Sequence, residues 1–156
     1  VCKVLDVGTL DISGIDKEKL YYTLEPIYAN GRTVYTPVDN EKVPIRKVLS
    51  KEEALELIER IPSIETLWVE NDKQREEIYK ATLKKNECCE WIKVIKTLYL
   101  RKQERLAQGK NITGTDGKYL SMAEENLYGE LAISLGIPKE EVEEYIIKSV
   151  EALDVV

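Results

Sequence analysis

The 156-residue sequence predicts an α+β fold, in which a small β meander is followed by an all-α bundle of about five helices. The first third is rich in β-forming residues and turn signals, and no helical pattern interrupts it. From Ser50 onward, apolar residues recur at helical spacing instead. We therefore expect two modules, a β module over residues 1–49 and a helical module over residues 50–156.

The β module contains runs of β-forming residues joined by turns, which predicts a small barrel or a strongly curved sheet. Residues 13–16 supply the first turn. The pair Asn30-Gly31 favours the positive φ angles of a type I′ hairpin. Pro37 has no N–H group for a ladder, so its strand is expected to lie at a sheet edge or to end there. The strand-forming runs are residues 1–7, 19–28 and 33–38.

The first two helices of the second module have local boundary signals. Ser50 and Glu53 can form a capping box, in which each side chain accepts a hydrogen bond from the other residue's backbone N–H. Pro62 is expected to stop this helix. Either Asn71 or Asp72 can cap the second helix.

The remaining helices are separated by polar and glycine-containing segments. Asn86 can cap the third helix, and residues 109–117 carry three glycines before the fourth. Gly136 suits the C′ position of the fourth helix, and Pro138 suits the first turn of the fifth. The five helices are expected near residues 51–61, 72–85, 88–110 and 118–135, and from Pro138 onward.

Charge is distributed unevenly along the chain, whose formal net charge is −6. Residues 63–111 hold 11 basic and 8 acidic residues, whereas residues 112–156 hold 3 and 10. A basic middle indicates a surface that faces a polyanion. The charged side of the third helix is either part of that surface or an ordinary solvated face. Its cations are Lys93, Lys96 and Arg101.

Lys102 departs from the simple pattern, because it falls near the centre of the apolar arc of the third helix. Either its stem lies along the core while its ammonium group reaches water, or the helix extends beyond the core on which it packs. The second alternative would project Lys102, Arg105 and Lys110 into solvent or onto a partner. The apolar side itself is formed by Trp91, Val94, Ile95, Leu98, Tyr99 and Leu106.

Trp68 is the other residue that stands apart from the regular patterns. It lies in the connector between the first two helices and not on an apolar stripe. Two interpretations stay open at this point. The indole is either buried as an anchor between modules or exposed, so that it can stack on nucleic acid or wedge into it.

The residue types argue against an enzyme and against a metal site. The absence of histidine removes the commonest general base and every Ser-His or Cys-His nucleophile. Cys88 and Cys89 have no second cysteine pair at ligand spacing, so we interpret them as packing residues. We expect no catalytic residue, no metal and no cofactor. An enzyme that used carboxylates would need two acidic groups converging in a pocket.

The cysteine content and the hydropathy pattern bear on location. Three cysteines without a disulfide framework fit a reducing compartment. The longest apolar runs are too short to span a membrane, and no signal peptide is visible. The sequence therefore predicts a cytoplasmic protein, which we expect to be monomeric.

Several short motifs occur together in a characteristic order. Residues 33–50 contain TVYTPVDN and VPIRKVLS, residues 96–110 read KTLYLRKQERLAQGK, and residues 118–137 end in the run LYGELAISLGI. In this order the motifs resemble the CarD family of bacterial transcription regulators. The resemblance implies an N-terminal Tudor-like β module and a C-terminal helical domain. The family's opening G-D-x-V-V-Y-x-x-x-G strand is not present in this sequence, so we expect a β module without its first strand.

The resemblance also implies two partners. The β module would bind the β subunit of RNA polymerase, and the helical domain would contact promoter DNA at the upstream edge of the transcription bubble. Family members of this kind stabilise the open promoter complex and are associated with the nucleoid through the polymerase. The polymerase-binding strand matches Thr33, Val34, Tyr35, Thr36 and Pro37.

The family's DNA-contacting tryptophan is harder to place. An alignment without a gap puts Arg75 at the tryptophan position, whereas a gap brings Trp68 into place. Phosphate contacts position a protein on DNA without specifying sequence, and lysine and arginine side chains supply them. The expected DNA-binding residues are Trp68, Lys73, Arg75, Lys80, Lys93, Lys96, Arg101, Lys102, Arg105 and Lys110.

Two functions from different classes therefore remain. The first is a CarD-like regulator that binds the polymerase and promoter DNA. The second is a Tudor-like adaptor whose helices make protein–protein contacts only, which the acidic fourth and fifth helices favour.

Overall fold

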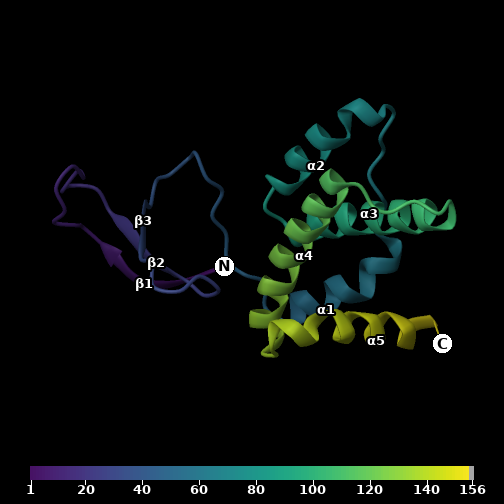
Figure 1. The fold of residues 1–156 in the computed structure, drawn as a ribbon. Helices are drawn as coiled ribbons and strands as arrows, with labels where there is room; N and C mark the ends of the chain where they lie inside the picture. Colours follow the sequence, from purple (N-terminus) through teal and green to yellow (C-terminus); the bar gives the residue numbers. More distant parts are fainter. Residues whose placement is uncertain (155–156) are drawn as a thin grey trace. The chain divides into compact units, whose positions relative to one another are not determined.

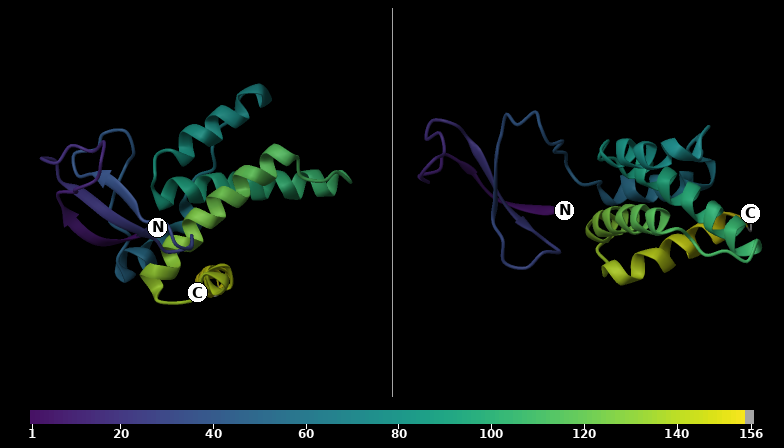
Figure 2. Two further views of the ribbon diagram at one scale, coloured as in Figure 1. Left: turned by 60° about the vertical axis from the view of Figure 1, so that its left-hand side comes forward. Right: turned by 45° about the horizontal axis from the view of Figure 1, so that its top comes forward.

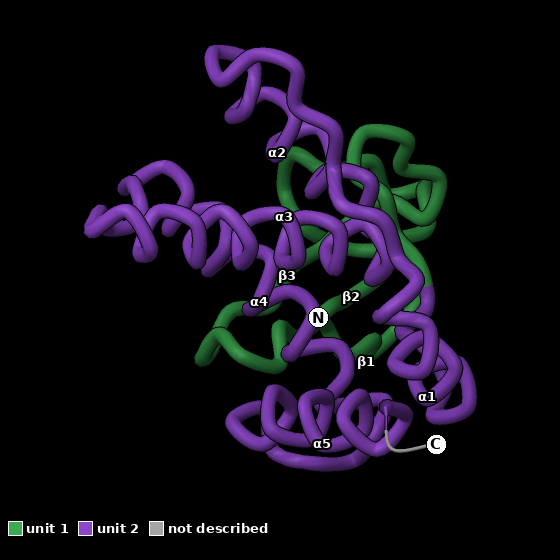
Figure 3. Tube along the Cα trace, turned by 90° about the vertical axis from the view of Figure 1, so that its right-hand side faces the viewer, with its two compact units in different colours: residues 1–46 green, residues 47–156 purple. Residues whose placement is uncertain are grey.

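A three-stranded antiparallel sheet followed by five α-helices forms the α+β fold that the sequence predicts (Figure 1). The computed structural model describes residues 1–154. The chain divides into two compact units, one over Val1–Arg46 and one that begins at Lys47 (Figure 3). Each unit is described by itself below.

The first unit is a β meander with strand order β1-β2-β3. Both β1 and β3 are edge strands, because each pairs only with β2. Pro37 pairs with Tyr21 at the end of β3, so the expectation of an edge strand that ends at this proline is confirmed. The strands are β1 Cys2–Gly8, β2 Tyr21–Pro26 and β3 Val34–Pro37.

The predicted type I′ hairpin at Asn30-Gly31 is wrong. Gly31 has φ 76°, but Asn30 does not adopt positive φ, and the β2–β3 pairing ends at Leu24 and Val34. A two-residue turn would require pairing right up to Asn30. Pro26 interferes with that pairing because it has no N–H group to donate to β3. The connection is therefore a longer loop.

The sheet buries little apolar surface of its own. Tyr21 is buried, whereas Val4, Leu5 and Val7 of β1 are each about half exposed. Among the described residues the sheet is an open meander with two free edges, and it does not close into the barrel that was one of the sequence-based alternatives. The Tudor-like character of this unit stays a prediction.

The second unit is entirely helical, and its core lies mainly between α3 and α4, with α1, α2 and α5 packed around them (Figure 2). The most deeply buried side chains include Tyr79, Val94, Leu98 and Leu131. None of the helices in residues 1–154 is long and apolar enough to cross a bilayer. The elements are α1 Lys51–Arg60, η1 Ile61–Ser63, η2 Asp72–Gln74, α2 Arg75–Leu83, α3 Cys88–Ala107, α4 Gly114–Leu135, η3 Lys139–Glu141 and α5 Val142–Asp154.

Two helix ends follow the local signals closely. The capping box of α1 is complete, since Ser50 N–H donates to Glu53 Oε2 (2.8 Å) and Glu53 N–H donates to Ser50 Oγ (3.1 Å). Gly136 ends α4 in the left-handed conformation, with φ 68°. Glycine adopts this conformation at little free-energy cost because it has no Cβ atom.

Other boundaries differ from the expectation. Asn86 does not cap α3: it has φ 55°, and Glu87 occupies the cap position without a side-chain hydrogen bond. Helix α4 begins at Gly114, earlier than expected, because Thr113 Oγ1 accepts a hydrogen bond from Asp116 N–H. The strong cap outweighs the low helix propensity of the glycines that follow. Pro138 is extended and precedes the first turn of η3.

Helix α3 extends beyond the core that its first half covers. Trp91 and Leu98 are buried, but Tyr99 and Leu106 are each about half exposed, although the apolar pattern places them on the core side. The helix has 20 residues, and its last turns lie beyond the neighbouring helices that bury the first. Lys102 is half-buried at the start of this extension, so both sequence-based alternatives hold in part.

Lys102 also takes part in the electrostatics of the helical core. Burial and the negative charge of Glu143 raise the pKa of Glu124 above its ordinary value, and the positive charge of Lys102 partly opposes this shift. Burial, together with the charges of Glu124 and Glu143, raises the pKa of Tyr128 as well. The ionised form of the half-buried Glu124 carboxyl group is thus disfavoured by its surroundings.

We predict that Glu124→Gln raises the thermal unfolding midpoint at pH 7. Because the folded-state pKa of Glu124 is raised, its stabilising contribution is fully present below the unfolded pKa and is lost as pH rises through the folded pKa. Glutamine mimics the protonated form, so the difference between variant and wild type should shrink as pH falls toward 4. Thermal unfolding followed by circular dichroism measures this. Glu125→Gln, at an exposed neighbour, is the control, and a neutral-pH midpoint that falls in Glu124→Gln contradicts the prediction.

Candidate nucleic-acid interface

Trp68 is strongly exposed. The connector between η1 and η2 has no regular secondary structure, and the exposure of its side chains alternates from Leu67 to Val69. Leu67 and Val69 point toward the helices and are half-buried, whereas 84% of Trp68 is exposed. The interpretation of Trp68 as a buried anchor is therefore wrong, and the alternative of an exposed indole is confirmed.

The connector is fastened to α3 by two consecutive residues. Leu67 N–H donates to Thr97 Oγ1 (2.8 Å), and the Thr97 hydroxyl donates to the carbonyl of Lys93 (2.6 Å). Lys96 Nζ donates to the carbonyl oxygen of Ile61 (2.9 Å) and also to those of Pro62 and Ile64. Lys96 was expected on a phosphate-facing side, but its ammonium group is engaged with backbone carbonyls of this chain.

Beneath the end of the connector, charged side chains form a linked network. Asp72 Oδ1 accepts a hydrogen bond from Arg75 Nε (2.7 Å) and lies 3.6 Å from Arg101 Nη1. Arg101 Nε donates to Oδ2 of the buried Asp116 (2.7 Å), and Arg75 Nη1 donates to the Tyr79 hydroxyl (3.0 Å). The hydrogen bond from Arg75, together with the charges of Arg75 and Arg101, holds the pKa of Asp72 below its usual value.

Trp68 stands at the edge of a shallow cavity of about 240 Å³. The exposed Leu100 contributes an apolar wall, and the half-buried Arg75 and Arg101 contribute positive charge, although each also serves a carboxylate of this chain. An aromatic surface next to guanidinium groups suits nucleic acid, whose bases stack and whose phosphates are anionic. The cavity is lined by Thr66, Leu67, Trp68, Val69, Arg75, Thr97, Leu100, Arg101 and Glu104.

Several of the expected cations are neutralised within the helical unit. Lys93 Nζ lies 2.9 Å from Glu90 Oε1, and Lys80 Nζ lies 3.6 Å from carboxylate oxygens of both Glu76 and Glu77. The spacing of such i,i+3 and i,i+4 pairs is visible in the sequence, but a search for basic residues alone does not take it into account.

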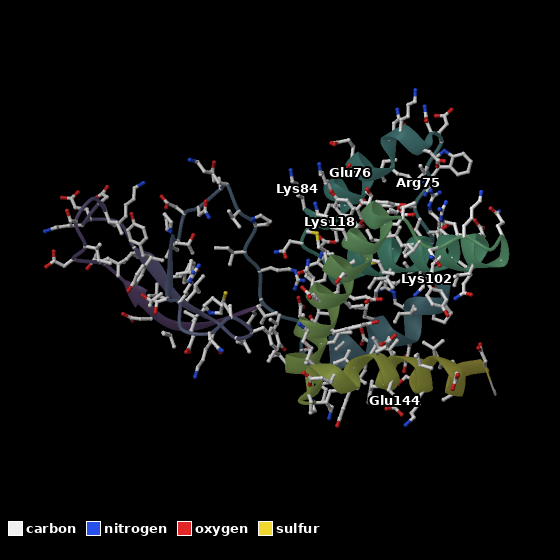
Figure 4. All side chains as sticks on the ribbon, viewed as in Figure 1. Arg75, Glu76, Lys84, Lys102, Lys118 and Glu144 are labelled. Carbon is white, nitrogen blue, oxygen red and sulfur yellow. The ribbon has the colours of Figure 1, made fainter. Side chains whose placement is uncertain are left out.

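Other cations have no carboxylate partner within residues 1–154. Lys73 and Lys110 are exposed, and Arg105 Nε donates to the carbonyl of Asn111 (2.8 Å) instead of to an acid. Lys84, directly after α2, and Lys118 on α4 are also exposed and were not among the residues predicted from the sequence, although the charge of Lys118 acts on Glu76 (Figure 4). Lys84 follows Lys80 by four residues, a helical spacing that could have revealed it.

A comparison with known families places these features in context. Residues 53–147 match the family described as "CarD, C-terminal domain", and this match covers more than half of the chain. The chain belongs to the CarD family. No curated protein matches the chain.

The CarD match covers every element from α1 to the middle of α5, and therefore includes Trp68, its connector and the arginine network. Members of the CarD family are transcription regulators and not enzymes. Among the described residues, no cluster of three or more histidine, cysteine, aspartate or glutamate side chains is arranged to hold a metal ion.

The strand that the CarD resemblance assigns to polymerase binding lies outside the matched region. Its residues 34–37 form β3, which presents a free edge within its own sheet. Val34 and Tyr35 are each about two-fifths exposed, and Thr36 Oγ1 accepts a hydrogen bond from Asn40 Nδ2 (3.2 Å). The strand is thus accessible for pairing, and its role as a polymerase contact stays a prediction.

We predict that the two tryptophans differ sharply in their contribution to stability. Trp68→Ala should change the free energy of unfolding by less than about 0.5 kcal/mol, because the indole makes little buried contact. Trp91→Ala should cost about 3–5 kcal/mol, since Trp91 is 5% exposed and its Nε1–H lies 3.4 Å from the Leu83 carbonyl oxygen. Urea unfolding measures both, and a decrease for Trp68→Ala as large as that for Trp91→Ala would show that the indole is buried.

Proposed function

We propose that this protein is a CarD-like transcription regulator that binds the β subunit of RNA polymerase and contacts promoter DNA at the upstream edge of the transcription bubble, where it stabilises the open complex. The observation that carries the proposal is the 84% exposure of Trp68 on a connector that is hydrogen-bonded to α3. Membership of the CarD family supports it independently.

An exposed indole on an ordered connector is costly for a protein that does not use it. A tryptophan side chain offers about 150–250 Å² of largely apolar surface, and leaving such surface in water forfeits about 25 cal/mol for each Å². In a duplex, an apolar side chain can wedge between base steps from the minor groove and partly unstack them. Trp68 has the size and the exposure for this role at the junction between duplex and melted DNA.

The pairing of cations separates the better phosphate candidates from the poorer ones. Lys73, Arg105 and Lys110 have no carboxylate partner in the described residues, and Lys73 lies five residues after Trp68. Arg75, Lys80, Arg101 and Lys102 are partly occupied by acidic neighbours and are weaker candidates. Lys93 and Lys96 are engaged within the chain, so we do not include them in the proposed interface.

The polymerase has an energetic role in this proposal. With a net charge of −6 and few unpaired cations near Trp68, the protein by itself should bind DNA weakly. A β3 edge bound to the polymerase β subunit would hold the helical unit at a high effective concentration next to the promoter. The proposed polymerase-contacting residues are those of the predicted strand: Thr33, Val34, Tyr35, Thr36 and Pro37.

We predict that the DNA contribution is visible in the salt dependence of open-complex lifetime. The double variant Lys73→Ala, Lys110→Ala should shorten the open-complex lifetime. It should also make the slope of log lifetime against log salt concentration shallower by about 1 for each phosphate that is no longer neutralised. Trp68→Ala should shorten the lifetime with little change in slope, because the indole is uncharged. Lys93→Ala is the matched control, since its ammonium group is paired with Glu90. Equal effects of all three changes would contradict the proposed interface.

The second candidate is an adaptor whose helices make only protein–protein contacts. The acidic composition of residues 112–156, with 10 acidic and 3 basic residues, favours this alternative.

We predict that Tyr35→Ala weakens capture of the purified polymerase β subunit, whereas Val43→Ala, at an exposed valine outside the strands, does not. If the chain captures the β subunit but Trp68→Ala leaves open-complex lifetime unchanged, the adaptor function gains support. If it fails to capture the β subunit, the polymerase contact is wrong.

A further inference from the structure

We infer that Thr97 and Lys96 of α3 are positioning residues for Trp68, which they hold outward on an ordered connector without contacting the partner themselves. This inference rests on the proposed function, because it assigns how the DNA-contacting side chain of that function is presented. The sequence assigned Lys96 to phosphate binding and gave Thr97 no role.

The hydrogen bond of Thr97 acts one residue away from the indole. Leu67 N–H donates to Thr97 Oγ1, so the peptide unit before Leu67 is fixed against α3. The Leu67 side chain is half-buried against the helical core. Leu67 and Val69 are half-buried while Trp68 between them is 84% exposed, so Trp68 is directed away from the helices.

The Thr97 hydroxyl is itself oriented. It donates its hydrogen to the Lys93 carbonyl at 2.6 Å, which leaves a lone pair to accept the Leu67 N–H at 2.8 Å. Valine has nearly the same shape but can do neither, and the half-buried Leu67 N–H would then lose its partner. Serine keeps the hydroxyl group and can make both bonds.

Lys96 holds the beginning of the same connector. Its ammonium group donates to the carbonyls of Ile61 and Pro62 in the short helix η1 and of Ile64 directly after it. Carbonyl groups at a helix end lack partners within the helix and carry partial negative charge. The Ile61 carbonyl also accepts the Ile64 N–H (3.2 Å), and Lys96 adds a charged donor to all three carbonyls, so consecutive residues of α3 fasten η1 and the connector at two points.

Such fastening affects binding through preorganisation. A side chain that is already ordered loses less conformational freedom when it enters DNA, and each rotamer-rich group that must be immobilised costs affinity. Loosening the connector should therefore weaken the DNA contact while every DNA-contacting side chain stays present. This is the behaviour that separates a positioning residue from a contact residue.

The test compares Thr97→Val with Thr97→Ser and with Thr82→Val in the full chain. Thr82 is the matched control because it is buried, and its hydroxyl donates to the Ile78 carbonyl within its own helix. The first readout is the NMR order parameter of the Trp68 backbone amide, which we expect to fall from the rigid range near 0.85 to below about 0.6 in Thr97→Val. Thr97→Ser and Thr82→Val should stay near 0.85.

The second readout is open-complex lifetime on a polymerase–promoter complex. Thr97→Val should shorten it by about 2- to 10-fold, with Thr97→Ser near wild type. Lys96→Met keeps the stem and removes the ammonium group, and it should likewise lower the Trp68 order parameter and shorten the lifetime. It replaces Thr97→Val in the test if that variant does not fold. An unchanged Trp68 order parameter in both variants would overturn the inference.

The two readouts separate this inference from the proposed function. If the order parameter falls as expected but neither Thr97→Val nor Trp68→Ala changes the lifetime, the positioning role stands and the DNA-contacting function fails. If Trp68→Ala shortens the lifetime while Thr97→Val lowers the order parameter without affecting the lifetime, DNA contact stands and positioning by Thr97 is overturned.

Discussion

Helix α3 packs its apolar residues against α4 and turns consecutive polar residues toward the connector, and both the core and the candidate interface depend on this double contact. Val94 and Leu98 are fully buried, while Lys96 and Thr97 between them hydrogen-bond to the segment that carries Trp68. The period of the helix makes this division unavoidable, because neighbouring positions point about 100° apart. A change in how α3 sits in the core would therefore also displace the connector.

The electrostatics of the helical unit are more local than the segment charges suggest. The basic middle of the sequence suggests a continuous cationic surface, but much of that charge is neutralised within the unit. Arg75 and Arg101 share Asp72, and Arg101 also engages the buried Asp116. Removing Arg101 would leave the buried carboxylate of Asp116 uncompensated, so Arg101 has a structural role whatever else it contacts, whereas the Asp72 side chain that Arg75 pairs with is exposed. The cations without a carboxylate partner are therefore the stronger candidates for phosphate contact.

The two units differ in how they obtain their stability. The helical unit has a contiguous core from five helices, whereas the sheet of the first unit buries little besides Tyr21 and presents two free edges. Free strand edges and exposed aliphatic side chains tend to recruit another chain. A protein partner on the sheet and a nucleic-acid partner near Trp68 would give the two units separate tasks, in line with the proposed function.

The sequence by itself determined the features that depend on near neighbours. The capping box at Ser50, the left-handed Gly136 and the end of β3 at Pro37 all involve groups close in the chain or the intrinsic geometry of one residue, and the order of the modules followed from hydrophobic periodicity. The tertiary structure decided the direction of Trp68 and the partners of Lys96 and Arg101, because those partners come from segments far along the chain. The structure also departs from the local signals at Asn30, where the β2–β3 pairing ends at Leu24 and Val34, and at Asn86, which precedes the cap residue Glu87. Local preferences amount to about 1 kcal/mol each, so contacts made elsewhere in the fold can outweigh them.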